Sequence, residues 1–309
     1  MPAFPTLPAN LPTLVAKAYA AALAAGDVIF TSSAATRDLR INDVVYRARF
    51  CPSLQHKPTP TPQTFSSSSS QPKAKANPFL PPQRGLLIAS IPDYNLILNR
   101  YPIIPQHFLL CTATFEPQTE PLRPQDLAAV YAVLRTWEDV STGERLYGFF
   151  NSGPDSGASQ PHRHVQFFPV PAERGKLPFD RSAAGDEGQE GEGDGEAWSH
   201  PRLPFLTFCI RYPKAVGVPE VVEAYETLLR RCEEARGKGC SYNMGITREW
   251  IALAPRISED GGREGVGING TVLAGEVMVK RDEDWEFFTE RGGLEGVLKG
   301  IGIVADARI

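Results

Sequence analysis

Two histidines stand one residue apart in this chain, and the residue types around them suit chemistry at phosphorus. His162 and His164 are two of five histidines, and Gln166 follows two residues later. Aromatic and branched residues close the segment 162–168, which favours a β-strand there. Alternate side chains of a strand share one face, so we expect His162, His164 and Gln166 to point the same way, with the two histidines about 7 Å apart.

The residues before the histidines predict a loop that can hold phosphate. Residues 152–161 read Ser-Gly-Pro-Asp-Ser-Gly-Ala-Ser-Gln-Pro, a run with no helical or strand periodicity. Glycine leaves backbone N–H groups accessible, and such groups together with hydroxyls can surround a phosphate chain. A neutral imidazole, with a reference pKa of about 6.5, is a competent nucleophile at cellular pH. The loop and the strand together therefore join an anion-binding loop to a nucleophile, which could form a covalent phosphoramidate, or to a general base.

The same residues allow other interpretations. A Gly/Ser loop is more often a plain turn than a phosphate site, and a lone histidine is more often a packed or surface residue than a catalyst. A His-x-His pair on a strand is also half of a metal site. Residues 160–168 offer no cysteine or carboxylate to complete such a site, so we predict no protein-bound metal.

Composition places the chain among ordinary globular proteins. It has 309 residues, of which 42% are hydrophobic and 22% charged, and no apolar run approaches the roughly 20 residues of a membrane helix. Residues 1–5 do not read as a secretory signal. The net charge is −4, but six acidic residues fall within the glycine-rich segment 186–196, so the remainder is near neutral and does not suit a nucleic-acid surface. Five scattered cysteines without a C-x-x-C pair favour a reducing compartment.

Periodicity predicts an α+β fold with a largely antiparallel sheet flanked by helices. We expect helices at 11–25, 124–137, 219–236 and 294–298, and strands at 27–31, 44–50, 86–89, 94–99, 107–112, 147–151, 162–168, 205–211, 242–247, 250–255, 272–280 and 285–288. Residues 59–77 and 181–199 contain few apolar side chains and are predicted to be disordered insertions. The whole chain, 1–309, is predicted to form one unit of two closely packed lobes, about 1–180 and 200–309.

The segment 151–168 resembles the active-site motif of the histidine-triad superfamily. The similarity is to its nucleotidyltransferase branch, which includes the galactose-1-phosphate uridylyltransferases and has glutamine in place of the third histidine. The fungal diadenosine tetraphosphate phosphorylases, also called ATP adenylyltransferases, are the closer match. Further stretches fit that family in order: 53–58, 98–105, 241–243, 247–250 and 267–271. The resemblance therefore spans most of the chain and implies a histidine-triad-like fold.

The resemblance implies a role for each residue of the motif. His164 would be the nucleophile that attacks the α-phosphorus and becomes adenylylated. His162 or a backbone carbonyl would hold its ring in the tautomer that leaves the attacking nitrogen bare, and Gln166 would donate an amide N–H to a nonbridging phosphoryl oxygen. The family's substrate-binding residues correspond to Lys57, Leu98, Asn99, Asn151, Gly157, Ala158, Ser159, Gln160, Asn269, Gly270, Thr271 and Lys280.

Several of these positions have a simpler interpretation, and two depart from the family pattern. Lys57 could be a solvated side chain beside a polar tract, Asn99 could cap a turn, and Asn269-Gly270 could be a type I′ hairpin turn. Ala158 stands where serine is frequent, which removes a hydroxyl but no backbone donor. Glu276 stands where an apolar residue is expected.

The expected activity is phosphorolysis of diadenosine tetraphosphate by phosphate to ATP and ADP, and the reverse reaction. A divalent cation, with Mg²⁺ as the leading choice, would enter with the nucleotide. Two alternatives stay open: a dinucleoside polyphosphate hydrolase of the same superfamily, and a non-catalytic adenine-nucleotide-binding protein. A hexose-1-phosphate uridylyltransferase is disfavoured because the zinc cysteines of that family have no counterpart here. We expect small-molecule partners only, with no nucleic acid or membrane, and a cytoplasmic location, with the nucleus also open.

Overall fold

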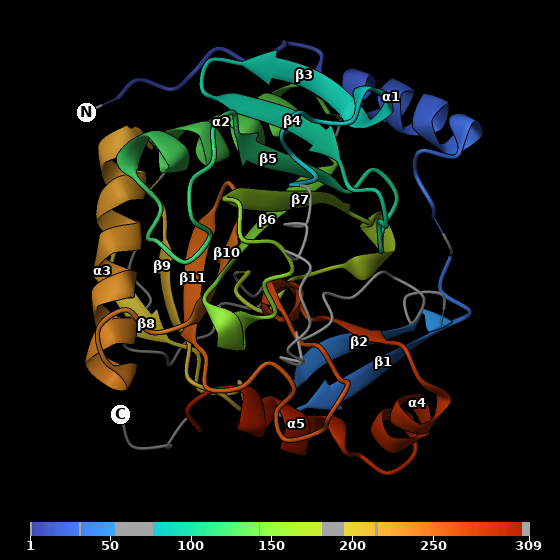
Figure 1. The fold of residues 1–309 in the computed structure, drawn as a ribbon. Coiled ribbons are helices and arrows are strands. Elements are labelled where there is room, and N and C mark those ends of the chain that lie inside the picture. The colour runs from blue at the N-terminus through green and yellow to red at the C-terminus, as the bar shows by residue number, and fades with distance from the viewer. Residues whose placement is uncertain are drawn as a thin grey trace, which may run out of the picture.

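A nine-stranded sheet forms the centre of the protein (Figure 1). The computed structural model describes residues 2–30, 32–52, 77–141, 143–180, 195–213 and 216–304. The strands lie in the order β3 (Leu87–Ile91), β4 (Tyr94–Leu98), β5 (Phe108–Thr112), β7 (His164–Val170), β6 (Arg145–Ser152), β10 (Tyr242–Ile246), β11 (Trp250–Pro255), β9 (Phe208–Arg211) and β8 (Ala197–Ser199). All neighbouring pairs in this sheet are antiparallel. The predicted α+β fold with a largely antiparallel sheet is confirmed.

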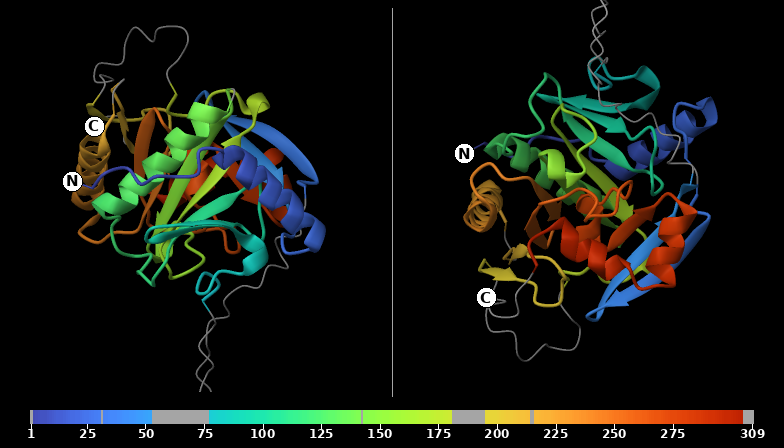
Figure 2. Two further views of the ribbon diagram at one scale, coloured as in Figure 1. Left: turned by 90° about the horizontal axis from the view of Figure 1, so that it is seen from above. Right: turned by 60° about the horizontal axis from the view of Figure 1, so that its bottom comes forward.

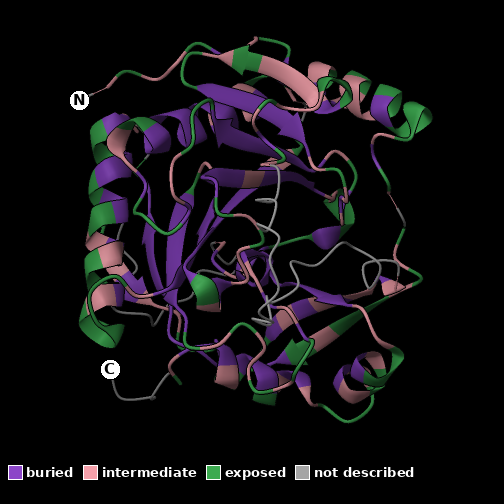
Figure 3. Ribbon diagram, viewed as in Figure 1, coloured by how far each residue is buried: buried purple, intermediate pink, exposed green. Residues whose placement is uncertain are grey.

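Three helices pack on one face of the sheet. They are α1 (Leu11–Ala25), α2 (Pro124–Val140) and α3 (Val218–Arg236), and their buried side chains share one hydrophobic cluster with Val165 and Phe167 of β7. Trp137 of α2 stacks on Phe108 with ring centroids 5.9 Å apart, and Phe108 stacks on Phe167 at 5.3 Å. Figure 3 shows buried and exposed residues alternating along α1 and α3, while the central strands are almost wholly buried. In the described part of the chain, no helix combines the length and apolarity needed to span a bilayer.

The opposite face of the sheet carries a second hydrophobic cluster, built with elements from both ends of the chain. These are the three-stranded sheet β1 (Ala35–Ile41), β2 (Val44–Phe50) and β12 (Glu276–Val279), and the helices α4 (Asp282–Thr289) and α5 (Leu294–Ile301). Figure 2 shows the red C-terminal helices beside the blue β1–β2 hairpin. Phe149 of β6 and Phe168 of β7 belong to this cluster. Asn151 comes two residues after Phe149 on β6, and Gln166 and His164 come two and four residues before Phe168 on β7. Alternate residues of a strand share one face, so the polar site begins where this cluster ends.

The predicted elements are mostly present, with several corrected boundaries. The helices expected at 11–25, 124–137, 219–236 and 294–298 and the hairpin of 242–255 are confirmed. Residues 27–30, expected within a strand, have no regular structure, whereas β1 and β8 were not predicted. The strand expected at 162–168 begins at His164, because the residues before it pair with a loop: His162 forms an isolated bridge with Pro117, and Arg163 N donates to the Glu116 carbonyl at 2.8 Å. The strand expected at 272–280 is reduced to β12, since Gly270–Ala274 form a 3₁₀ helix. Residues 285–288, expected as a strand, lie within α4, whose first turn carries the three acidic residues that favour a helix N-terminus.

Both predicted insertions end earlier than the sequence indicated. Residues 195–199 are ordered, and Ala197–Ser199 form the edge strand β8 paired with β9. Asn77 is ordered as well, and its side chain contacts His162. These ends were wrongly assigned to disorder, because a strand of three residues is too short to give a periodic pattern. The remaining residues, 59–76 and 181–194, lie outside the described part of the chain.

A buried ion cluster holds β12 in place and explains the unexpected Glu276. Its side chain is 1% exposed, its Oε2 accepts a bond from Arg49 Nε at 2.6 Å, and its Oε1 lies 3.1 Å from Arg174 Nε. Arg174 Nη2 also donates to the carbonyls of Val45 and Ala274. Two arginines thus compensate the carboxylate in a position that otherwise suits an apolar side chain.

Replacing this carboxylate should destabilise the fold strongly. In Glu276→Gln the two arginines stay in place without a counter-charge, so we expect the free energy of unfolding to fall by about 3 kcal/mol. Urea denaturation measures the change. Glu286→Gln, at an exposed position of α4, is the matched control and should shift stability by less than about 0.5 kcal/mol. Equal effects of the two substitutions would contradict this role of the ion cluster.

Candidate active site

His164 lies at the start of β7, where β7 is still paired with β5 but no longer with β6. The β5–β7 ladder pairs it with Cys111, whereas the β6–β7 ladder ends at the pair Phe149–Gln166. The Gln118 side chain fills the gap: its Oε1 accepts from His164 N at 2.8 Å, and its Nε2 donates to Asn151 O at 2.9 Å. The backbone of His164 is therefore held on both sides, and its side chain is 3% exposed.

The imidazole of His164 is held in one tautomer. Its Nδ1 lies 2.8 Å from the carbonyl oxygen of His162. Because a carbonyl oxygen can only accept a hydrogen bond, Nδ1 carries the proton, and Nε2 of the neutral ring keeps its lone pair. The ring of Phe79 packs against the imidazole at a centroid distance of 5.2 Å. This arrangement suits Nε2 for attack on phosphorus.

The ring of His162 is fully buried and bonded at both nitrogens. Its Nε2 lies 2.8 Å from Thr112 Oγ1 and 3.1 Å from the Thr114 carbonyl, and its Nδ1 lies 3.0 Å from Asn77 Nδ2. The carbonyl requires a proton on Nε2, so Nδ1 accepts from Asn77. Burial lowers the pKa of His162 and outweighs the bonds to Thr112 and Thr114, which raise it. Of the two predicted ways to orient His164, the structure has the backbone carbonyl of His162.

This bonding of His162 does not suit the metal interpretation of the histidine pair. A ring nitrogen that donates to a carbonyl cannot at the same time bind a metal, and the other nitrogen faces an amide. Within the described residues, no three side chains of His, Cys, Asp or Glu gather closely enough to hold a metal ion.

Gln166 lies opposite Phe149 and Leu109 in the sheet and is half-buried. Its Oε1 is 3.0 Å from Nε2 of His107, a histidine that the motif did not include. Asn99 lies beside this pair, since its N–H donates to the carbonyl of His107 at 2.9 Å. The structure thus brings Asn99 to Gln166, and Leu98, the last residue of β4, is buried next to it.

Asn151 joins the end of β6 to the C-terminal part of the chain. Its Oδ1 accepts bonds from Gly270 N at 2.8 Å and from Asn243 Nδ2 at 2.9 Å. Buried Arg256 donates to Asn243 Oδ1 and so fixes the orientation of that amide. Both acceptor positions of Asn151 Oδ1 are filled, so a contact of this side chain with a ligand must come from Nδ2.

The segment Asn269, Gly270 and Thr271 lies directly on β6. Tyr147 donates its hydroxyl proton to the Gly270 carbonyl at 2.6 Å, and a Cβ at position 270 would lie 2.9 Å from Asn151 Oδ1. Only glycine fits this approach. Asn269 Oδ1 accepts from Thr271 N at 3.0 Å and caps the 3₁₀ helix, so a type I′ hairpin turn at this place is excluded.

The predicted phosphate loop lies against the same segment. Gly157 has a φ of +75°, and a Cβ there would lie 2.9 Å from the Ile268 carbonyl oxygen. Ala158 and Gln160 are half-buried and Ser159 is exposed. Asn151, the loop 157–160 and residues 269–271 are therefore adjacent, at the end of the sheet that holds His164. Lys280 lies beside Gly267, and Lys57 falls outside the described residues.

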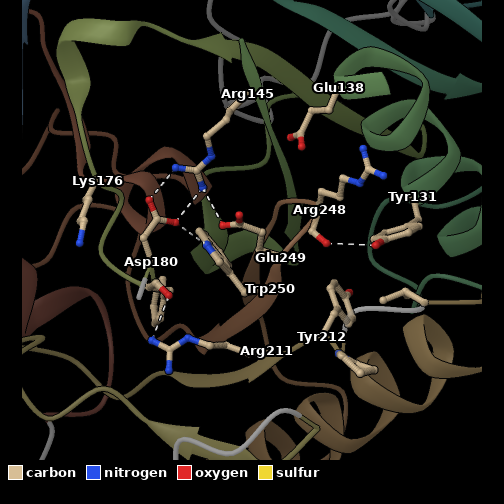
Figure 4. A pocket seen from close by; sticks show the side chains of 13 residues that line it. Tyr131, Glu138, Arg145, Lys176, Asp180, Arg211, Tyr212, Arg248, Glu249 and Trp250 are labelled. Carbon is tan, nitrogen blue, oxygen red and sulfur yellow. Dashed lines mark hydrogen bonds and ion pairs between the residues drawn. The ribbon is translucent and has the colours of Figure 1, made fainter. Parts of the chain in front are cut away.

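A separate cavity of about 810 Å³ lies at the far end of β6 (Figure 4). Arg145 at its wall precedes Asn151 by six residues, which is about 20 Å along a strand. Arg145 pairs with Asp180 at 2.6 Å and with Glu249 at 3.5 Å, and Trp250 Nε1 donates to Asp180 at 2.9 Å. These charges compensate one another within the wall, and the cavity contains no predicted site residue.

Sequence reasoning missed four residues that shape the site: Asn77, Phe79, His107 and Gln118. His107 could have been found, because it is one of five histidines and the first residue of a predicted strand. Gln118 stands between proline and threonine in a loop, and nothing in its neighbours indicates that its amide replaces a pair of backbone bonds. Asn77 is the last residue of a polar tract that was assigned to disorder, and Phe79 closely follows that tract.

Comparison with known proteins identifies the family of this chain. A family model described as the Ap4A phosphorylase N-terminal domain matches residues 3–183, and one described as the ATP adenylyltransferase C-terminal domain matches residues 201–304. Protein APA1 of Saccharomyces cerevisiae is 28% identical over 307 residues, which cover 93% of this chain and 92% of that protein. Diadenosine 5′,5‴-P1,P4-tetraphosphate phosphorylase 2 of the same yeast is 30% identical over 266 residues, 79% of each chain.

Solved structures resemble the whole chain. The crystal structure of yeast Ap4A phosphorylase Apa2 in complex with Ap4A has a TM-score of 0.81 at 26% identity, covering 97% of this chain and 99% of that one. The complex of the same enzyme with AMP also has a TM-score of 0.81, covering 98% and 99%. The first family model alone matches more than half of the chain, and the chain therefore belongs to the Ap4A phosphorylase family.

Proposed function

We propose that this chain catalyses phosphorolysis of diadenosine tetraphosphate (Ap4A) by phosphate to ATP and ADP, and the reverse reaction, through an adenylylated His164. The name of the yeast phosphorylase and the Ap4A bound to Apa2 support the substrate. The observation in this chain that carries the proposal is the 2.8 Å contact from His164 Nδ1 to the His162 carbonyl. It leaves Nε2 as the nucleophilic nitrogen of a ring whose backbone is held on both sides.

The reaction divides into two displacements at one phosphorus atom. In the first, His164 Nε2 forms a bond to the α-phosphorus, the bond to the bridging oxygen breaks, and ATP leaves as an anion. In the second, a phosphate oxygen attacks the same phosphorus, the P–N bond breaks, and ADP leaves with the neutral imidazole restored. The Nδ1 proton stays on the ring throughout, and the His162 carbonyl stabilises the positive charge that the ring gains on adenylylation.

The neighbouring groups favour transfer to phosphate over transfer to water. Gln166 can donate to a phosphoryl oxygen but, as a neutral amide, cannot take a proton from water. A hydrolase at this site would need such a base. A non-catalytic nucleotide-binding protein would have no use for a histidine held in its nucleophilic tautomer. Product analysis with and without phosphate separates the three functions, since only the phosphorylase requires phosphate.

The divalent cation and the location of the protein are part of the same proposal. The donors around His164 are amides, imidazoles and carbonyls rather than the carboxylate-rich set that Mg²⁺ takes. We therefore assign the cation to the phosphate oxygens of the nucleotide, with which it enters as part of the substrate. Lys57 would supply further positive charge to the polyphosphate. All five cysteines are free thiols, which supports a reducing compartment such as the cytoplasm.

The adenylylated intermediate should be trapped when the acceptor is withheld. Brief incubation with Ap4A in the absence of phosphate should add one AMP to His164, as mass spectrometry of peptides will show, and phosphate should release it as ADP. His164→Ala should abolish both the label and turnover. His200→Ala, remote from the site, is the control and should keep both. A label on His162, or full turnover without any label, would overturn the covalent route.

Gln166 should act on the transition state and not on folding. Removing one oxyanion donor costs about 10²-fold or more in turnover, so Gln166→Ala should lower kcat by that factor in protein that thermal melting shows to be folded at the assay temperature. Gln166→His should also slow transfer to phosphate and should raise the share of hydrolysis, because an ionisable group now faces the phosphoryl oxygens. Gln125→Ala, exposed on α2, is the matched control. Wild-type turnover in Gln166→Ala would exclude the assigned role.

The neutral His162 should make the fold sensitive to mild acid. Its pKa in the folded protein lies below the usual value. As the pH falls, His162 therefore becomes protonated at a higher pH in the unfolded chain than in the folded protein. Its contribution to stability is full above about pH 6.5 and is lost as the pH falls through the folded pKa. The free energy of unfolding should therefore decrease less between pH 7 and pH 5 in His162→Gln than in the wild type, as urea denaturation at each pH will show. Identical decreases would mean that His162 does not titrate in this range.

A further inference from the structure

The two ends of the Gln166 amide have opposite effects on a bound phosphoryl group. The NH₂ end donates hydrogen bonds to phosphoryl oxygens, whereas the carbonyl end would repel them. A half-turn of the amide exchanges these ends with almost no change in shape. Turnover therefore depends on a neighbour that distinguishes the amide oxygen from the amide nitrogen.

His107 is placed to make that distinction. Its Nε2 lies 3.0 Å from Gln166 Oε1, and an amide oxygen accepts only from a nitrogen that carries a proton. With Oε1 held on His107, the Gln166 NH₂ group points away from His107, and Gln166 itself lies on the strand face that carries His164. In the reversed orientation two N–H groups would face each other, and the carbonyl oxygen would face the phosphate.

The protein holds His107 rigidly. The side chain is 2% exposed, and its ring packs against Phe149 and Phe168 at centroid distances of 5.9 and 6.1 Å. The backbone is fixed as well, since the His107 carbonyl accepts from Asn99 N at 2.9 Å. Asn99 Oδ1 accepts from Tyr101 N at 2.9 Å, which turns the Asn99 NH₂ group toward the His107 ring, 3.4 Å from both ring nitrogens. Because an amide NH₂ group can only donate, it favours the tautomer in which Nδ1 accepts and Nε2 carries the proton for Gln166.

We propose that His107 is a positioning residue for the transfer reaction: its Nε2–H fixes the Gln166 amide so that the NH₂ end faces the phosphoryl group. This inference rests on the proposed function of Gln166 and deepens it. His107 does not touch the substrate in this role and acts through the glutamine alone. Loss of the bond should then lower kcat, because the Gln166 side chain can reverse its amide and can also leave the phosphoryl group for other rotamers, so that the productive arrangement becomes a minor one, while KM should change little.

A double-mutant cycle tests the proposal. His107→Phe keeps a planar ring between Phe149 and Phe168 but removes the Nε2–H donor, and we expect kcat for Ap4A phosphorolysis to fall about tenfold. In the Gln166→Ala background the same substitution should change kcat by less than about twofold. His107→Gln should restore most of the activity, since its amide nitrogen occupies nearly the position of Nε2. Thermal melting of each variant reports any loss of folding.

Each outcome supports or contradicts the positioning role of His107. A tenfold loss in both backgrounds would show that His107 acts on folding or packing and not through Gln166, and an unchanged kcat in His107→Phe would also overturn the proposal. Absence of phosphorolysis in the wild type would instead refute the proposed function itself. If His107→Phe fails to fold, His107→Asn replaces it in the cycle with the same expected values, because its shorter amide cannot reach Gln166.

Discussion

The site depends on one interruption of the central sheet, where β6 and β7 part after the pair Phe149–Gln166. Two strands that diverge would leave unpaired backbone groups in a buried place, which costs about 1–3 kcal/mol for each group. The amide of Gln118 supplies a donor to one strand and an acceptor to the other and so removes that cost. The opening creates room for the imidazole of His164 while its backbone stays as firmly held as in a regular sheet.

Most of the fold could be predicted from the sequence because its elements carry their own signals. The helix α2 has proline near its start and an apolar stripe, and the hairpin β10–β11 has strand-forming residues on both sides of a short turn. Residues 195–199 gave no such signal. Their strand is three residues long and exists because its partner β9 is already in place. Tertiary pairing, not local preference, decides such an element.

Only part of the candidate site could be predicted from the sequence. The motif marked His164, Gln166 and the loop 157–160, and the structure places Gly157 of that loop against Ile268 and Asn269. It could not indicate Gln118 or His107, because a hydrogen bond between side chains far apart in sequence leaves no periodic pattern. The motif also could not show that the side chains of Asn269 and Thr271 form hydrogen bonds with nearby backbone groups, those of Thr271 and Glu276. The atoms left for a ligand are the Asn269 Nδ2 group, the lone pairs of the Thr271 hydroxyl and backbone groups.

The place of β10 in the sheet has a consequence for how the chain is made. β10 pairs with β6 on one side and β11 on the other, so a strand encoded late completes the sheet begun by residues 87–170. While the ribosome is still synthesising residues 171–241, one edge of β6 has no partner, and exposed strand edges invite association with other chains. The sheet of the first half thus stays incomplete until the second half is synthesised. The time that residues 242–246 take to emerge determines how long the β6 edge is exposed to association.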